Sequence, residues 1–314
     1  EGACCEEGAR CEEEARCEAW GQQICGGKNY HREKELGGLT MAVSLDDIKK
    51  LREQLGTGMV DTKNALEEAQ GDLEKATEIL RLKGAKGNAK RADRSTQQGL
   101  VAAHESDGAA YLIELACETD FVAKNEKFMS LAEDVLSAVV QSGAEDLASA
   151  ISAQAGSATV AELIADQAAI IGEKVELRRC AKILGDSFAI YLHKTNKDLP
   201  PQVGVVLGYS GTDKETARSV AQHISFADPQ FLSREDVPEE TVAAERRIVE
   251  EISRNEGKPD AALPKIVEGR LSSFFKQVAL LEQEYARDNK LQIKQVVDQA
   301  GIIVSDFARF RVGS

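Results

Sequence analysis

Apolar side chains recur with a helical period in the first well-patterned part of the chain. The first run places four of them on one side of a helix: Leu45, Ile48, Leu51 and Leu55. Ser44 can cap this helix, and Gly56 is expected to end it. Similar segments follow near residues 60–69 and 73–83, the latter ending at Gly84. This pattern predicts a compact module of three short helices with a small core.

The period of the apolar positions changes after residue 98. Alternation and turn residues predict six strands, at 100–104, 111–117, 175–184, 187–193, 203–209 and 302–310. Ser106-Asp107-Gly108 and Gly185-Asp186 are typical of hairpin turns. Helical periods return at 126–141, 160–171 and 212–226. Two strand-then-helix units of this kind predict two small α+β subdomains.

Residues 237–286 interrupt the second unit. Pro238 and Pro264 each begin an apolar helical pattern, and Gly257-Lys258-Pro259 separates the two patterns. Two helices of similar length joined by a tight turn predict an antiparallel helical hairpin. Because each helix buries little except against the other, we expect the pair to project from the body.

The predicted fold class is therefore α+β, with a three-helix module, two small α+β subdomains with antiparallel sheets, and a projecting antiparallel helical hairpin. The expected parts are 1–40, a disordered or non-native extension; 41–83, the helical module; 84–98, a basic linker; 99–184, the first α+β subdomain; 185–236, the second α+β subdomain; 237–286, the helical hairpin (coiled coil); and 287–314, a C-terminal helix and strand completing the second subdomain.

Charge narrows the classes of function. The formal net charge of −14 argues against a general nucleic-acid binder, which needs a basic face for phosphates. A local basic run at 83–94 is interpreted as part of a solvated tether, with a binding site as the alternative. No stretch is apolar and long enough to span a bilayer, so no membrane contact is expected.

The cysteines are concentrated near the N-terminus. Of seven, only Cys117 and Cys180 lie beyond residue 40, and we expect both to be reduced, half-buried strand residues of a cytoplasmic protein. Residues 1–40 lack the features of a signal or transit peptide, and the folded pattern begins after Met41, the expected true start. Zinc binding by the clustered cysteines is the alternative, but the paired C-x-x-C spacing is missing.

Motifs of covalent chemistry are missing from the sequence. It contains no G-x-S-x-G, Walker A, dinucleotide or H-E-x-x-H motif, and its histidines have no partner at ligand spacing. We therefore expect no enzyme, no cofactor and no metal site, although a hidden acid–base pair stays an alternative.

One short segment, residues 118–125, has two interpretations. Thr119 or Asp120 can cap the following helix while Phe121 packs inward as a hydrophobic staple. Alternatively, Phe121 points outward as an anchor for a pocket of a partner protein. Physical arguments alone favour the first interpretation.

Three segments in the same order resemble the bacterial elongation factor Ts family. They are residues 119–125 (TDFVAKN), residues 51–59 (LREQLGTGM) with Asp61, Lys63 and Ala65-Leu66, and residues 171–174 (IGEK) running into 177–179 (LRR). The resemblance covers residues 41–314 and favours the outward interpretation of Phe121.

The resemblance implies a protein that binds elongation factor Tu carrying GDP and accelerates GDP release. It assigns a wedge beside the magnesium and phosphate site to Thr119, Asp120, Phe121 and Val122. It assigns docking of the UBA-like module to Arg52, Met59, Val60 and Lys63. Further contacts fall on Arg91, Ile171, Gly172 and His193, although a satisfied strand-end histidine is the alternative for the last.

Two departures from the family pattern change these expectations. Val60 stands where relatives often have a methionine, and no extra helix follows residues 310–312, so contacts of that helix are not expected. A plain helical adaptor is the other class of function kept open. It would need no exposed pair at Asp120 and Phe121.

Overall fold

The computed structural model describes residues 43–55 and 59–314, apart from the side chains of residues 52–55 and 85. The expected extension 1–40, with its candidate zinc-binding cysteines, lies outside this range. So do Met41 and Gly56, the expected end of the first helix.

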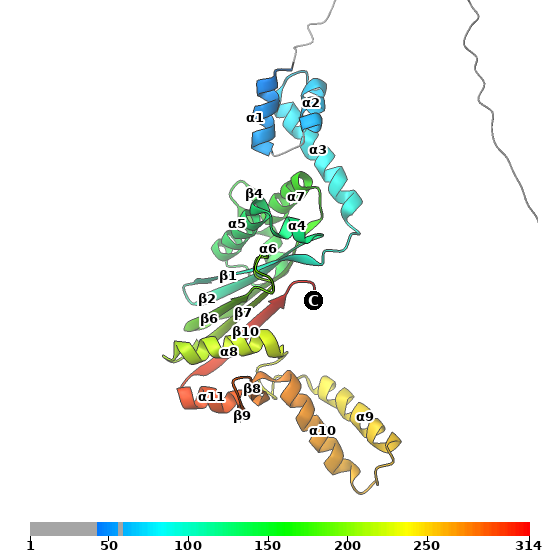
Figure 1. Ribbon diagram of the computed structural model, residues 1–314, viewed down its shortest axis with the longest axis vertical. Helices are drawn as coiled ribbons and strands as arrows, with labels where there is room; N and C mark the ends of the chain where they lie inside the picture. Colours follow the sequence, from blue (N-terminus) through cyan, green and yellow to red (C-terminus); the bar gives the residue numbers. More distant parts are fainter. Residues whose placement is uncertain (1–42, 56–58) are drawn as a thin grey trace, which may run out of the picture. The chain divides into compact units, whose positions relative to one another are not determined.

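The N-terminal helices form where the apolar period predicted them (Figure 1). They are α1 (Leu45–Leu55), α2 (Met59–Glu68) and α3 (Leu73–Arg91). Their small core contains Ile48, Leu51, Ala65, Leu66, Ala69, Ala76 and Leu80. Ser44 Oγ accepts a hydrogen bond from the backbone N of Asp46 at 3.1 Å, and Asp72 caps α3 in the same way.

Helix α3 is longer than the sequence indicated, because it continues through Gly84 and ends at Arg91. Gly84 allows a close approach to α7 (Val160–Ile171): a Cβ at this position would lie 2.6 Å from Cβ of Ala169. Asn88 Nδ2 also donates to the carbonyl O of Ala165 at 2.7 Å. Packing against α7 thus stabilises the helix beyond the glycine, and half of the expected linker is helical.

Two antiparallel sheets follow. The first has the order β1-β2-β5, from β1 (Gln98–Ser106), β2 (Ala109–Cys117) and β5 (Val175–Leu184). The second has the order β10-β7-β6, from β6 (Ser187–His193), β7 (Val203–Ser210) and β10 (Ile303–Arg311). The predicted antiparallel strands and the α+β class are confirmed.

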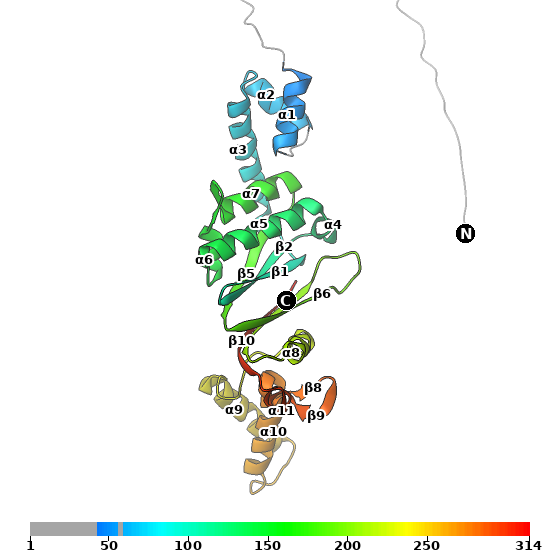
Figure 2. The same ribbon diagram turned by 90° about the vertical axis from the view of Figure 1, so that its left-hand side faces the viewer.

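The two sheets pack face to face, each with helices on its outer side (Figure 2). Helices α5 (Glu126–Ser142) and α7 cover the first sheet; α8 (Lys214–Ala227) and α11 (Ile293–Ala300) cover the second. The inner faces meet through Ala110, Leu112, Ile183, Val206 and Ala308. Strand β2 is buried at every position because both of its faces are covered.

Residues 237–286 contain α9 (Glu239–Asn255) and α10 (Leu263–Val278), which pack against each other. Their shared core contains Val237, Val249, Val267, Leu271 and Phe275. Ile252 on α9 is exposed.

Several short elements carried no periodic signal in the sequence. They are α6 (Leu147–Ser152), β3 (Gln154–Ala155), β4 (Ala158–Thr159), η1 (Leu280–Glu282), β8 (Glu284–Tyr285) and β9 (Asp288–Gln292). Strands of two residues are too short to show an alternation, so only tertiary contacts reveal them.

The two cysteines of the sheet are free thiols, as expected. Cys117 is fully buried, however, and not half-buried, because α5 and α7 cover its face of β2. Desolvation and the nearby charge of Glu173 raise the pKa of the Cys117 thiol to about 12. Cys180 is half-buried, and desolvation raises its pKa to about 11.

Within residues 43–55 and 59–314, we find no helix with the length and apolar character needed to cross a membrane.

Candidate functional site

The segment after β2 forms a short helix, α4 (Asp120–Ala123), that presents an aromatic ring to solvent. Thr119 is its N-cap and accepts a hydrogen bond from the backbone N of Val122 at 3.4 Å. Val122 and Ala123 are buried, whereas Phe121 is 79% exposed. Thr119 therefore caps the helix as physical arguments indicated, but Phe121 does not pack inward as a staple.

A charged pair accompanies the exposed ring. Lys124 Nζ lies 2.9 Å from Oδ2 of Asp120, and this hydrogen bond lowers the pKa of the Asp120 carboxyl and raises that of Lys124. The same ammonium lies 5.9 Å from the centroid of the Phe121 ring. An acid, a cation and an aromatic ring are thus presented together at the surface.

A second loop, after α7, is hydrogen-bonded to the first. Gly172 ends α7 with φ of 83°, a backbone conformation that favours glycine. The next side chain, Glu173, accepts hydrogen bonds from Thr119 N at 3.0 Å and Thr119 Oγ1 at 2.7 Å. The structure therefore brings Ile171 and Gly172 to the Thr119 loop, although 54 residues separate the bonded pair.

The first loop also supplies a hydrogen-bond acceptor to the second. Glu118 Oε1 accepts a hydrogen bond from the backbone N of Lys174 at 2.6 Å. Arg94 Nη1 donates to both oxygens of the same carboxylate, at 3.2 and 3.1 Å. Each loop thus supplies a glutamate to the backbone of the other.

The residues expected to dock the N-terminal module lie mainly on one face of α2. Met59 and Val60 are 56% and 70% exposed, and Lys63 is exposed beside Glu67, with Nζ 3.6 Å from Oε1. The opposite face of α2 is buried through Thr62, Ala65 and Leu66. Arg52 lies in α1, but its side chain is outside the described part of the chain.

Arg91 and His193 make their side-chain contacts with other residues than those of the two loops and of α2. Arg91 Nη2 donates to Asn88 Oδ1 at 2.8 Å and approaches the carbonyl O of Ala168 at 3.5 Å, so it is turned toward α7. His193 is exposed at the end of β6, where its Nδ1 lies 3.2 Å from Oη of Tyr191.

The connection after β6 nevertheless comes near α4 (Figure 2). The charge of Asp198, on this connection, contributes to the raised pKa of Lys124.

Sequence reasoning missed Glu118, Glu173 and Arg94 as parts of this site. Glu173 lies inside residues 171–174, which carry the family resemblance, and Glu118 directly precedes residues 119–125, which also carry it; this was the available signal. Their roles depend on contacts between segments far apart in sequence, and no local pattern reports those contacts.

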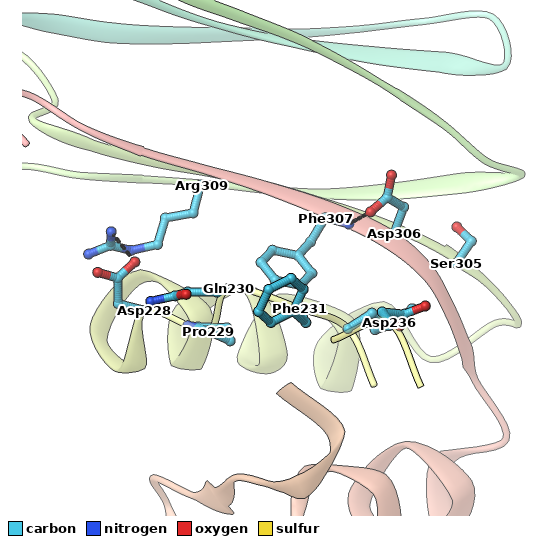
Figure 3. A pocket seen from close by; sticks show the side chains of 10 residues that line it. Asp228, Pro229, Gln230, Phe231, Asp236, Ser305, Asp306, Phe307 and Arg309 are labelled. Carbon is cyan, nitrogen blue, oxygen red and sulfur yellow. Dashed lines mark hydrogen bonds and ion pairs between the residues drawn. The ribbon is translucent and has the colours of Figure 1, made fainter. Parts of the chain in front are cut away.

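A cavity on another part of the molecule offers no comparable chemistry. It lies between β10 and the segment after α8, and Figure 3 shows Arg309 and Asp228 turned toward each other there. Arg309 Nη1 lies 2.6 Å from Oδ1 of Asp228, and Asp236 accepts hydrogen bonds from Ser233. The charged groups of the cavity are thus used within the fold. Across the described residues, no group of three or more His, Cys, Asp or Glu side chains could hold a metal ion.

Comparison with known proteins gives a consistent result. The family model described as Elongation factor TS matches residues 118–314. Elongation factor Ts of Leifsonia xyli subsp. xyli is 71% identical over 273 residues, which cover 87% of this chain and 99% of that protein. The protein of the same name from Clavibacter sepedonicus is 68% identical over 268 residues (85% and 98%), and that from Tropheryma whipplei is 51% identical over 272 residues (87% and 99%).

Proposed function

Because the chain belongs to the elongation factor Ts family, we propose that it is the guanine nucleotide exchange factor of elongation factor Tu. It acts in translation elongation by binding the GDP form of the GTPase and promoting GDP release. The observation that carries the mechanism is the exposed Phe121 ring beside Asp120, on a loop held by hydrogen bonds. The protein acts by binding and catalyses no covalent step, and its place of action is the cytoplasm.

The chemistry of the exchange lies in the partner. A magnesium ion bridges the phosphates of a bound nucleotide, so disturbing its site weakens much of the nucleotide's hold. Asp120 and Phe121 enter beside this site and displace partner side chains that position the ion. By linkage, a factor that prefers the empty GTPase weakens nucleotide binding to the same extent. A thousandfold faster release corresponds to about 4 kcal/mol off the barrier.

The remaining surface provides docking. Met59, Val60 and Lys63 form an exposed face on α2 that suits a partner's apolar patch with an acidic neighbour, and Arg52 belongs to the same docking set. Thr119 and Val122 hold the wedge, while Ile171, Gly172, Arg91 and His193 supply further contacts. Neither a nucleic acid nor a membrane is part of the proposed interaction, in keeping with the net charge of −14.

The domain organisation proposed for this role keeps the boundaries expected from the sequence. Residues 41–83 form a UBA-like module, and residues 237–286 form a projecting antiparallel helical hairpin of coiled-coil type. The basic segment 84–98 connects the module to the two α+β subdomains, with its first half as the end of α3.

The direct test is release of a fluorescent GDP analogue from purified elongation factor Tu, with the full chain added in catalytic amounts. Fast release that saturates with concentration supports the proposal. Binding without acceleration contradicts it and leaves a helical adaptor that has the family's fold. Phe121 is the residue to vary first, because an adaptor would not need it.

A further inference from the structure

We propose that Glu173 is a positioning residue for nucleotide exchange: it holds the Thr119 cap and thereby sets the orientation of Asp120 and Phe121. This inference rests on the proposed function, because it assigns the exchange step to the loop that Glu173 holds. Glu173 does not itself touch the partner in this role. It acts through Thr119.

The geometry of the carboxylate supports this role. One oxygen of Glu173 accepts from Thr119 N at 3.0 Å, and the other accepts from Thr119 Oγ1 at 2.7 Å. A hydroxyl has one proton and two lone pairs. Because Glu173 takes that proton, a lone pair of Oγ1 remains to accept from Val122 N, 3.4 Å away. Glu173 therefore selects the hydroxyl orientation that caps α4.

Thr119 is also held on its carbonyl side. Cys117 Sγ donates to the carbonyl O of Thr119 at 3.2 Å, so the N–H, hydroxyl and carbonyl of one residue all have partners. The loop that carries Glu173 is fixed in turn by the bond from Lys174 N to Glu118. The Phe121 ring is 79% exposed, so its position depends mainly on the backbone of α4. That backbone begins at the Thr119 cap.

Glu173→Gln is the informative variant because it replaces one acceptor oxygen with an NH2 donor of nearly the same size. The amide oxygen can satisfy the N–H or the hydroxyl of Thr119, but not both in the native arrangement. Loss of one charge-assisted hydrogen bond is expected to slow the maximal rate of GDP release about tenfold. The concentration of factor that gives half-maximal release should change less than about threefold, since α2 supplies separate docking contacts.

The matched control is Glu133→Gln on α5, which makes the same chemical change at an exposed position. It should leave the exchange rate unchanged. The second comparison is Glu173→Gln in a Phe121→Ala background. If Glu173 acts through the loop, Glu173→Gln should have little further effect on the rate of GDP release once the Phe121 ring is removed. The effects of the two substitutions then do not add.

A measurement independent of activity completes the test. Hydrogen exchange of the Thr119 amide, followed by NMR, should be faster in Glu173→Gln than in the wild type or in Glu133→Gln. Unchanged exchange at Thr119, a wild-type maximal rate of GDP release, or additive effects with Phe121→Ala would each overturn the positioning role. The wild-type chain is measured before any variant. If it fails to accelerate GDP release, the proposed function itself is overturned.

Discussion

Phe121 illustrates how one residue can be placed against its own preference. Burial of an aromatic side chain usually stabilises a fold, but Phe121 is 79% exposed. Its neighbours Val122 and Ala123 are buried. Nothing in the packing of α4 requires an aromatic side chain at this position. Its surroundings are the Asp120–Lys124 pair, which keeps charge beside the ring. This exposure supports the proposed contact with a partner.

We expect Phe121→Ala to slow nucleotide exchange by about tenfold to hundredfold. This is the usual cost of losing an aromatic side chain that anchors a protein interface. The midpoint of thermal unfolding should barely move because the ring is exposed. The chain offers a matched control in Phe226→Ala, since Phe226 on α8 is also 79% exposed. A large drop in the unfolding midpoint for Phe121→Ala alone would support the staple interpretation instead.

Cys117 gives a second prediction at the residue scale. Its buried thiol, with a pKa of about 12, should resist iodoacetamide at pH 8.5 in the native protein and react once urea unfolds the chain. The unfolded thiol ionises near its ordinary pKa of 9.0, whereas the folded thiol keeps its proton. Stability from this group is therefore present below pH 9 and declines as the pH rises toward 12.

Mass spectrometry of the peptide containing Cys117 measures the modified fraction. Equal labelling of native and unfolded protein would contradict the burial on which this prediction rests.

Among the elements, α3 departs most from its sequence pattern. Gly84 would usually end or weaken a helix, but here it lets α3 lie against α7. Asn88 and Arg91 extend the contact through the carbonyl groups of Ala165 and Ala168. The basic segment is therefore partly ordered by the first α+β subdomain, and Arg94 continues the connection to Glu118.

We expect Gly84→Ala to weaken the attachment of α3 to α7. Alanine gains roughly 1 kcal/mol of helix propensity, but its Cβ would lie 2.6 Å from Cβ of Ala169, and overpacking costs about 1–3 kcal/mol. The net effect should be faster amide exchange in the second half of α3. Ala169→Gly in the same chain should restore protection.

Gly87→Ala provides the control on the same helix. The nearest atoms to its new Cβ belong to the flexible guanidinium of Arg91, at 3.1 Å, so protection should be kept or increased. If both alanine variants behaved alike, the close approach at Gly84 would not be what holds α3.

For the whole molecule, the decisive feature is the contact between two small sheets. Each sheet packs its outer face against helices, where the larger cores lie, and its inner face against the other sheet through a smaller core. Gly204 in β7 lies where the two sheets approach each other closely. A Cβ there would lie 2.8 Å from Leu112 Cδ1 on β2 and 3.1 Å from Val101 Cγ2 on β1.

Gly204→Ala should therefore lower the free energy of unfolding by about 1–3 kcal/mol, because the new methyl group forces the sheets apart. The midpoint of urea unfolding measures the change. Gly269→Ala on α10 is the control: apart from the adjoining residues and the helix's own backbone, no atom lies within 4 Å of the new Cβ, so helix propensity should raise stability by about 0.5–1 kcal/mol. Equal stability of the two variants would contradict the tight contact between the sheets.

The sequence by itself determined the long elements and the chemistry to look for. Amphipathic periods set the longer strands and the helices other than α3 to within a few residues, because each must bury at least one face. Local side-chain chemistry singled out residues 118–125 and indicated the cap, and the resemblance to a family favoured the outward direction of Phe121.

Only the tertiary structure decided which long-range contacts hold these parts. Four features depend on neighbours dozens of residues away. They are the exposure of Phe121, the hydrogen bonds between Glu173 and Thr119, the extension of α3 past Gly84 and the full burial of Cys117. A sequence pattern reports the preference of a residue for water or for a local backbone conformation. It does not report which distant atom takes the remaining hydrogen bond or fills the space beside a glycine.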